Sequence, residues 1–198
     1  MNDVIFETVV TTVAPDGKPH IAPMGVRYVE QQVVLMPFKP STTLDNIAAT
    51  GHAVLNIVID TRVFAGCVTG RRDWPVLPAE RVPGVRLACA LRHIELRLAE
   101  RIDDVQRPVL HMARVHEATH DAFAGFNRAQ AAVIEGAVLV SRLHMLPPQK
   151  VQSEFAYLQI AIDKTAGPEE REAWGWLTAA VQRHLAGHAH DHVEGPAP

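Results

Sequence analysis

The first 119 residues form a series of short apolar runs separated by turn residues. The runs VIFETVVTTV (4–13), HIAPMGVRYV (20–29), VVLM (33–36) and AVLNIVID (53–60) are rich in β-branched residues, which are typical of strands. LACALRHIELRLAE (87–100) alternates apolar and polar residues, which predicts a half-buried strand, and PVLHMARVHEAT (108–119) follows it after a turn. Six antiparallel strands with short connections predict an α+β protein built on a closed or split β-barrel.

The hydrophobic period changes to that of helices after residue 126. Three segments (127–146, 149–165 and 169–185) have apolar spacing near 3.6, and Pro147-Pro148 and Gly167-Pro168 separate them. We therefore predict a barrel over residues 1–122, a C-terminal three-helix segment over 123–187, and a disordered, histidine-rich tail over 188–198. The stretch 61–85, with Pro75, Pro78 and Pro83, predicts little regular structure beyond a short helix near 63–68.

Composition excludes several classes of protein. With 198 residues and 47% hydrophobic content the chain can bury a core, so global disorder is excluded. A net charge of -3 gives no reason to expect nucleic acid or an anionic membrane as the main partner. Cys67 and Cys89 form neither a metal-spaced pair nor a disulfide framework, and no export signal or membrane-spanning run is visible. We expect a cytoplasmic protein.

The stretch PFKPSTTLDNI (37–47) places one lysine and three hydroxyls where a short helix begins. A helix N-terminus attracts anions, and Lys39, Ser41, Thr42 and Thr43 would add donors at the same point, as in a phosphate site. The alternative is an ordinary helix cap at Thr42, with Asp45 completing a capping box. Both interpretations stay open at this stage.

Histidine is frequent, with 11 residues, and two groups of histidines resemble metal ligands. His116-Glu117-Ala118-Thr119-His120 matches the H-E-x-x-H signature of zinc hydrolases, but that mechanism needs a helix and this run is strand-like. We interpret the match as a coincidence and predict no metal ligand. The tail carries His184, His188, His190 and His192 beside Asp191, where solvated side chains are a simpler interpretation than a metal site.

The motifs ETVVTT, HIAPMGV, PFKPSTTLDNI and AVLNIVID, in this order and spacing, resemble the FMN-binding split barrel of flavin reductase-like proteins. The resemblance is strongest to an uncharacterised archaeal and bacterial branch that joins this barrel to a C-terminal helical segment. GFNRAQAAVIEGAVLVSRLHMLP resembles the start of that segment.

The resemblance implies FMN as the cofactor. It places the phosphate on the hydroxyl-rich loop and the isoalloxazine ring along the second strand. The cofactor-binding residues it implies are Pro23, Met24, Gly25, Val26, Phe38, Lys39, Ser41, Thr42, Thr43 and Asn56. Asn56 would bond the flavin or its ribityl chain, and the alternative for it is an asparagine satisfied within the core.

The resemblance also implies a homodimer with FMN at the subunit interface, to which Trp74 and Arg128 would contribute, and a small-molecule electron donor or acceptor. The implied activity is that of an oxidoreductase, and the resemblance suggests a link to tetrahydromethanopterin-dependent one-carbon metabolism. The sequence identifies no catalytic residue, although His20 is a candidate proton donor. The alternatives are a flavin carrier without catalysis and, less favoured, a zinc hydrolase acting through His116 and His120.

Overall fold

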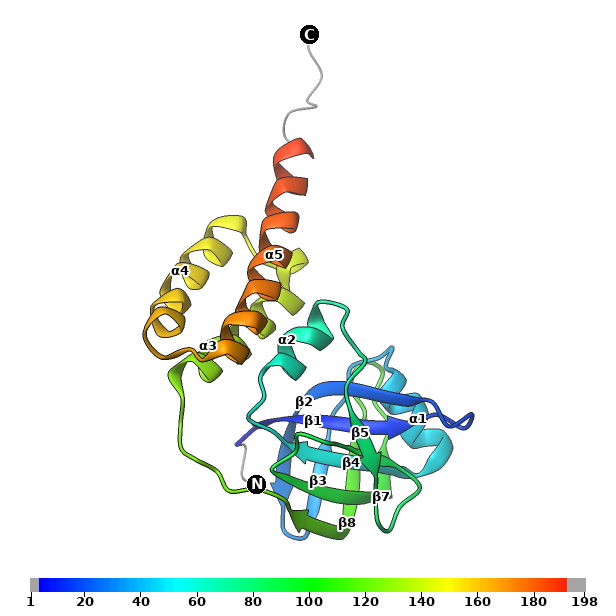
Figure 1. Ribbon diagram of the computed structural model, residues 1–198. Helices are drawn as coiled ribbons and strands as arrows, with labels where there is room; N and C mark the ends of the chain where they lie inside the picture. The colour runs from blue at the N-terminus through cyan, green and yellow to red at the C-terminus, as the bar shows by residue number, and fades with distance from the viewer. Residues whose placement is uncertain (1–3, 192–198) are drawn as a thin grey trace. The chain divides into compact units, whose positions relative to one another are not determined.

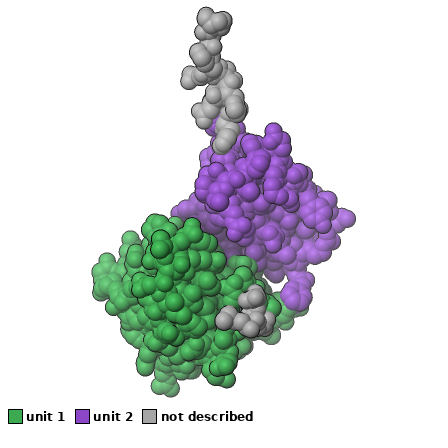
Figure 2. All heavy atoms as spheres, turned by 180° about the vertical axis from the view of Figure 1, so that it is seen from behind, with its two compact units in different colours: residues 1–59, 72–124 green, residues 60–71, 125–198 purple. Residues whose placement is uncertain are grey.

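The computed structural model describes residues 4–191, which form two compact units. The barrel unit comprises residues 1–59 and 72–124, and the helical unit comprises residues 60–71 and 125–198 (Figures 1 and 2). The sequence-based prediction assigned all of residues 1–122 to the barrel. The segment 60–71 leaves the barrel and packs with the C-terminal helices, although it lies in the middle of the barrel sequence.

Six strands close the barrel, as the period-2 runs predicted. Their order is β1-β2-β3-β8-β7-β4, and every pairing between neighbours is antiparallel. The strands are β1 (Phe6–Val13), β2 (Pro19–Val29), β3 (Gln32–Leu35), β4 (His52–Ile57), β7 (Arg92–Ile102) and β8 (Val109–Thr119). Alternate residues point inward, and Leu35, Leu55, Ile94, Leu96 and Met112 belong to one fully buried core cluster.

The second edge of β2 is largely open. β2 pairs with β1 from Pro19 to Val26, but it pairs with β3 only from Val26 to Val29. Among the described residues no strand therefore pairs with the other edge of Pro19–Gly25. Pro23 lies in this stretch, where the missing N–H of proline is tolerated.

The N-cap of the helix α1 (Thr42–Thr50) lies one residue earlier than predicted from the sequence. Ser41, not Thr42, is the N-cap, and its Oγ accepts a hydrogen bond from the N–H of Leu44 at 3.2 Å. Asp45 is therefore the fourth residue after the cap and cannot complete a capping box. Gly51 ends the helix with φ of 74°, a left-handed conformation that glycine adopts without strain.

A two-stranded sheet, β5 (Val76–Pro78) with β6 (Val85–Leu87), covers the outer face of β1, β4 and β7 (Figure 1). Its strands were not predicted. The prediction of a half-buried β7 is wrong at His93 and Glu95, which are 0% exposed because this segment lies over them. We call residues 79–87 the covering segment.

Buried polar side chains hold the covering segment in place. Oδ1 of Asn56 accepts a hydrogen bond from the N–H of Leu87 at 2.8 Å. The hydroxyl of Thr11 donates to the carbonyl of Val85. The carboxylate of Glu95 accepts from the three successive N–H groups of residues 80–82, at 2.6, 2.7 and 2.8 Å. The outer face of the barrel therefore binds the backbone of the covering segment.

The helical unit contains α2 (Arg62–Val68), α3 (Arg128–Ser141), the short 3-10 helix η1 (Leu143–Met145), α4 (Pro148–Thr165) and α5 (Pro168–Asp191). The three predicted C-terminal helices are present. Trp174 is buried, stacks on Phe155 with ring centroids 4.9 Å apart, and donates its indole N–H to Gln159. Trp176 is partly buried under the guanidinium of Arg71.

Most of the predicted disordered tail (188–198) lies outside the described residues. The backbone of α5 continues to Asp191, three residues past the predicted start of the tail at 188, and residues 192–198 lie outside the described residues. His192, one member of the histidine group of the tail, is among the residues outside the description of the structure. In the described part of the chain, no helix is both long and apolar enough to cross a membrane.

Candidate functional site

A cavity of about 380 Å³ lies where the β1–β2 turn meets the start of α1. Its volume falls within the range of small-molecule sites. The lining residues are Ala14, Lys18, Pro19, His20, Ile21, Thr42, Asn46 and Arg72. They come from the turn after β1, the start of β2, the first turns of α1 and the chain just before β5.

The electrostatics of this cavity favour an anion. Lys18 and Arg72 are the charged residues of the lining, and both are positive. Thr42 is the first residue of α1, so the partial positive charge and free N–H groups of a helix N-terminus lie beside it. An anion with several acceptor oxygens, such as a phosphate, would find donors on more than one side of the cavity.

His20 lines the same cavity, and its pKa is lowered there. Burial lowers the pKa of His20 below its ordinary value, and the positive charge of Arg72 lowers it further. The ring is therefore suited to accept a proton or a hydrogen bond. The sequence suggested His20 as a candidate proton donor, and the lowered pKa favours the neutral form of the ring.

The residues predicted to hold a phosphate are separated by the structure. Thr42 is exposed and lines the cavity, whereas Thr43 is 2% exposed and does not line it. The ammonium of Lys39 donates to the carbonyl of Asp104 at 2.8 Å and is not part of the lining. Ser41 accepts the capping bond from Leu44. Lys18 and Arg72, and not Lys39, are the cations that line this cavity.

The residues predicted to contact the ring lie on β2. Pro23, Met24 and Gly25 are partly buried on the stretch whose second edge is unpaired, and Val26 is a buried core residue at its end. The side chain of Ile5 covers Gly25, since a Cβ there would lie 2.7 Å from Cγ2 of Ile5. A side chain at position 25 would therefore force the exposed side chain of Ile5 to shift.

Phe38 and Asn56 have different surroundings. Phe38 is 57% exposed and lies under the guanidinium of Arg107, 4.5 Å from its ring centroid. Asn56 is fully buried, and its amide donates to the carbonyls of Val9 and Val54 and to the hydroxyl of Thr11 at 3.1–3.2 Å. Its Oδ1 also accepts a hydrogen bond, from the N–H of Leu87. These contacts are those of an asparagine whose hydrogen bonds are made within the core.

The two further residues suggested for an interface belong to different units. Trp74 lies in the barrel unit, two residues after Arg72, and Arg128 begins α3 in the helical unit.

Sequence reasoning missed Lys18 and Arg72. Lys18 follows the Asp16-Gly17 turn and was interpreted as part of an ordinary hairpin connection. Arg72 lies in a stretch for which no element was predicted. The signal that could have found them is topological, because the hairpin turn of β1 and β2 and the start of α1 lie at the same end of the barrel. That proximity depends on the register of the barrel, which a pattern of apolar residues does not give.

The H-E-x-x-H match does not form a zinc-hydrolase helix. His116 and Glu117 lie in strand β8, and His120 directly follows it. Glu117 is directed to a different partner, since it forms an ion pair with Arg92 at 2.6 Å. The strand context predicted from the sequence is confirmed.

Solved structures with the same fold include an FMN-bound protein, a flavoredoxin and a flavin reductase component. An FMN-bound protein of the DUF447 family from Methanosarcina mazei superposes with a TM-score of 0.76 at 18% identity, covering 89% of this chain and 94% of that one. A flavoredoxin from Methanosarcina acetivorans gives 0.51 at 15% identity, covering 61% and 74% of the two chains. The flavin reductase component of a bacterial two-component tryptophan halogenase also gives 0.51 at 15%, covering 60% and 82%.

Comparison with protein families covers both units. Residues 6–121 match the N-terminal domain of a protein family of unknown function, DUF447, and residues 127–179 match the C-terminal part of the same family. The two matches lie in the order that the family requires and together span most of the described chain. The fold is that of the flavin reductase-like split barrels, and the chain belongs to the DUF447 family.

Proposed function

We propose that this protein binds FMN, with the phosphate in the cavity lined by Lys18, Thr42 and Arg72. The observation that carries the proposal is the convergence of two cations and a helix N-terminus on one cavity of suitable size. The FMN-bound relative with the same fold supports the choice of flavin over other phosphate-bearing ligands.

The open edge of β2 suits the isoalloxazine ring. The cavity includes Pro19, His20 and Ile21, and the residues that follow them on β2, Ala22 to Gly25, pair with β1 but with no described strand on their other side. Backbone groups on an unpaired edge have free hydrogen-bonding capacity, which the edge of a flavin ring can use. Bound FMN would supply hydride and electron transfer at its ring, while the chain supplies position, charge and exclusion of water.

Purification without added flavin tests the cofactor directly. We expect a yellow protein, or a colourless one that binds added FMN in a one-to-one ratio. Isothermal titration with FMN and riboflavin measures how much the phosphate contributes, and FMN should bind more tightly. Equal affinity for the two ligands would show that the cavity does not hold the phosphate.

We further propose an oxidoreductase. The alternative is a flavin carrier, and oxidation of NADH or NADPH under steady-state conditions separates the two. Repeated turnover with an electron acceptor supports the enzyme, whereas binding and release of FMN without turnover supports the carrier. Tetrahydromethanopterin derivatives are worth including among the acceptors, because the family resemblance implies a link to one-carbon metabolism.

We expect the protein to be a homodimer whose dissociation is opposed by FMN. A partner subunit would cover the open edge of β2 and exclude water from the ring. A ligand that binds the dimer preferentially stabilises it by mass action. Light scattering over a wide range of protein concentration, with and without FMN, measures this linkage. A monomer that binds FMN stoichiometrically would contradict the dimer and leave the phosphate site intact.

A further inference from the structure

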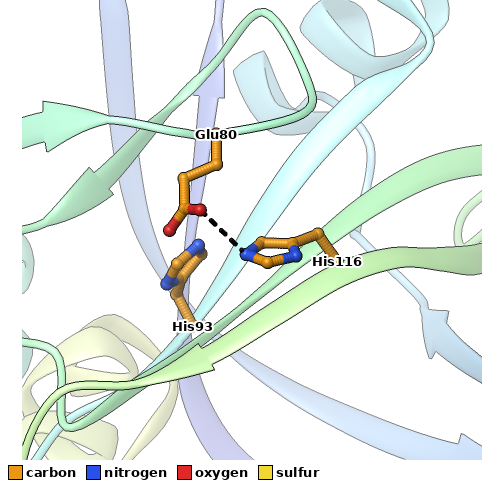
Figure 3. Close-up of side chains that lie close together, drawn as sticks. All are labelled: Glu80, His93 and His116. Atoms are coloured by element: carbon orange, nitrogen blue, oxygen red, sulfur yellow. Dashed lines mark ion pairs between the residues drawn. The ribbon is translucent and has the colours of Figure 1, made fainter.

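Three imidazoles and two carboxylates gather on the outer face of the barrel, outside the cavity described above. His93 is 0% exposed on β7, and its ring centroid lies 5.9 Å from that of His116 and 5.0 Å from that of His120. Glu95 lies two residues along β7 and Glu80 lies in the covering segment. Figure 3 shows Glu80, His93 and His116 directed toward one another from three different parts of the chain.

The geometry points to a divalent transition-metal site, with Zn²⁺ as the best-suited ion, ligated by Glu80, His93 and His116. One potential ligand atom from each of these residues lies within 4.8 Å of those of the other two. Two imidazoles and a carboxylate form a ligand set that holds zinc in proteins, with a fourth position left for another ligand.

The distances fit tetrahedral coordination. Zinc bonds of about 2.0–2.1 Å place neighbouring ligand atoms about 3.3–3.5 Å apart in a tetrahedron. Nε2 of His116 lies 3.3 Å from Oε2 of Glu80, which meets that spacing without any movement. The two remaining pairs both involve His93, lie within 4.8 Å and need to close by up to about 1.4 Å. The partly exposed side chains of Glu80 and His116 have the freedom to move toward the buried His93.

His116 has a nitrogen that lacks a hydrogen bond. Its Nε2 is enclosed by the protein and forms no hydrogen bond among the described residues, although Oε2 of Glu80 lies 3.3 Å away. A buried polar atom without a partner is costly. A metal ion between His116 and Glu80 would satisfy it.

His93 already has the outer contacts that a ligand histidine requires. Its Nδ1 lies 2.8 Å from Nε2 of His120, and its Nε2 lies 3.2 Å from Oε1 of Glu95. If either nitrogen binds the metal, the other keeps a partner that fixes the orientation of the ring. His120 and Glu95 would therefore be positioning residues, and His120 would become the hydrogen-bond partner of His93 if Nε2 is the ligand.

The local charge is suited to a cation. Two carboxylate side chains, Glu80 and Glu95, lie beside the imidazoles, and Oε1 of Glu95 is 3.2 Å from Nε2 of His93. The carboxylate of Glu95 is held in place by the backbone N–H groups of residues 80–82. Carboxylate oxygens in this position favour a divalent cation.

This proposal departs from both interpretations of the H-E-x-x-H match. The match was expected to be either a coincidence or a zinc hydrolase with His116 and His120 as its ligand pair. Here His116 is a ligand because of the strand register, which pairs it with Glu95 across β7 and β8. The other ligands come from β7 and from the covering segment. A bound ion would link that segment to the barrel.

The test is Zn²⁺ binding by protein purified without a polyhistidine tag, stripped with a chelator and titrated against a chromophoric zinc indicator. We expect one tight Zn²⁺ per chain and a higher thermal midpoint in its presence. Glu80→Gln and His116→Ala should each weaken zinc binding by at least about a hundredfold, since loss of even an outer partner costs about 10–100-fold. Both residues are partly exposed, so the apo variants should fold, as circular dichroism would show.

The histidine-rich end of the chain provides the matched control. A variant with His188, His190 and His192 changed to alanine should keep the tight Zn²⁺. Loss of stoichiometric zinc in that control, with retention in Glu80→Gln and His116→Ala, would assign the metal to the tail and overturn the proposal. Absence of any tight Zn²⁺ in the wild-type protein would overturn it as well.

Discussion

Replacing Lys18 and Arg72 together by alanine is expected to weaken FMN binding about a hundredfold and to leave riboflavin binding unchanged. Both cations line the cavity in which Thr42 begins α1. A hydrogen bond to a charged group contributes roughly 1.5–3 kcal/mol, and two such bonds with incomplete additivity contribute about 3 kcal/mol. Each 1.4 kcal/mol is about a factor of ten in the dissociation constant. Isothermal titration with the two ligands measures the difference.

Lys39→Ala is the matched control for this experiment. Lys39 lies in the hydroxyl-rich loop that the sequence assigned to the phosphate, but its ammonium donates to the carbonyl of Asp104. We therefore expect FMN affinity to change less than about threefold, a difference well under 1 kcal/mol. If Lys39→Ala abolishes FMN binding and the double variant does not, the phosphate lies on the loop as first predicted and the cavity has another role.

Replacing Asn56 by alanine is expected to destabilise the barrel by about 3 kcal/mol. The change removes every hydrogen bond of a fully buried amide and leaves the N–H of Leu87 and the carbonyl of Val9 without that partner. A buried polar group left unsatisfied costs roughly 1–3 kcal/mol. For a protein of this length the thermal midpoint should fall by about 6–12 °C. Differential scanning calorimetry on the apoprotein measures this shift independently of the flavin.

The control for Asn56 is an amide with a single side-chain partner. Gln32 on β3 is partly exposed and contacts His111 at 3.1 Å, so Gln32→Ala should cost less than about 1 kcal/mol. An Asn56→Ala variant with unchanged stability but much weaker FMN binding would show that Asn56 serves the cofactor. Reduced stability with FMN affinity preserved in the folded fraction would show that it serves the core.

The barrel could be predicted from the sequence because its strands carry a local signal. Alternating residues such as Ile94 and Leu96 point into the barrel, and this period of two is visible without any knowledge of partners. The three C-terminal helices were predictable for the same reason, since Pro147-Pro148 and Gly167-Pro168 separate them in the sequence. The cap at Ser41 was missed by one residue because three adjacent hydroxyl residues can all cap a helix.

The remaining features depend on contacts between distant residues. Glu95 looks like a solvent-facing residue in an alternating strand, and only the covering segment makes it a buried one. His93 and His116 are 23 positions apart in the sequence, and the β7–β8 pairing brings them together. Lys18 and Arg72 line one cavity, although Lys18 belongs to the β1–β2 turn and Arg72 to the chain between α2 and β5. Local sequence patterns carry no information on contacts between residues that are far apart in the sequence.

The covering segment is held mainly through its backbone, and this has a consequence for how the family can diverge. Asn56 and Glu95 bond to N–H groups of residues 80–82 and 87, which any residue except proline provides. Substitutions in the covering segment therefore leave these bonds intact, whereas a change of Asn56 or Glu95 breaks them at once. Among DUF447 proteins we expect the residue type to vary along the covering segment and to be conserved at Asn56 and Glu95. Glu80 is the exception within the segment, because we propose it as a metal ligand. Where Glu80 is kept, His93 and His116 should be kept with it.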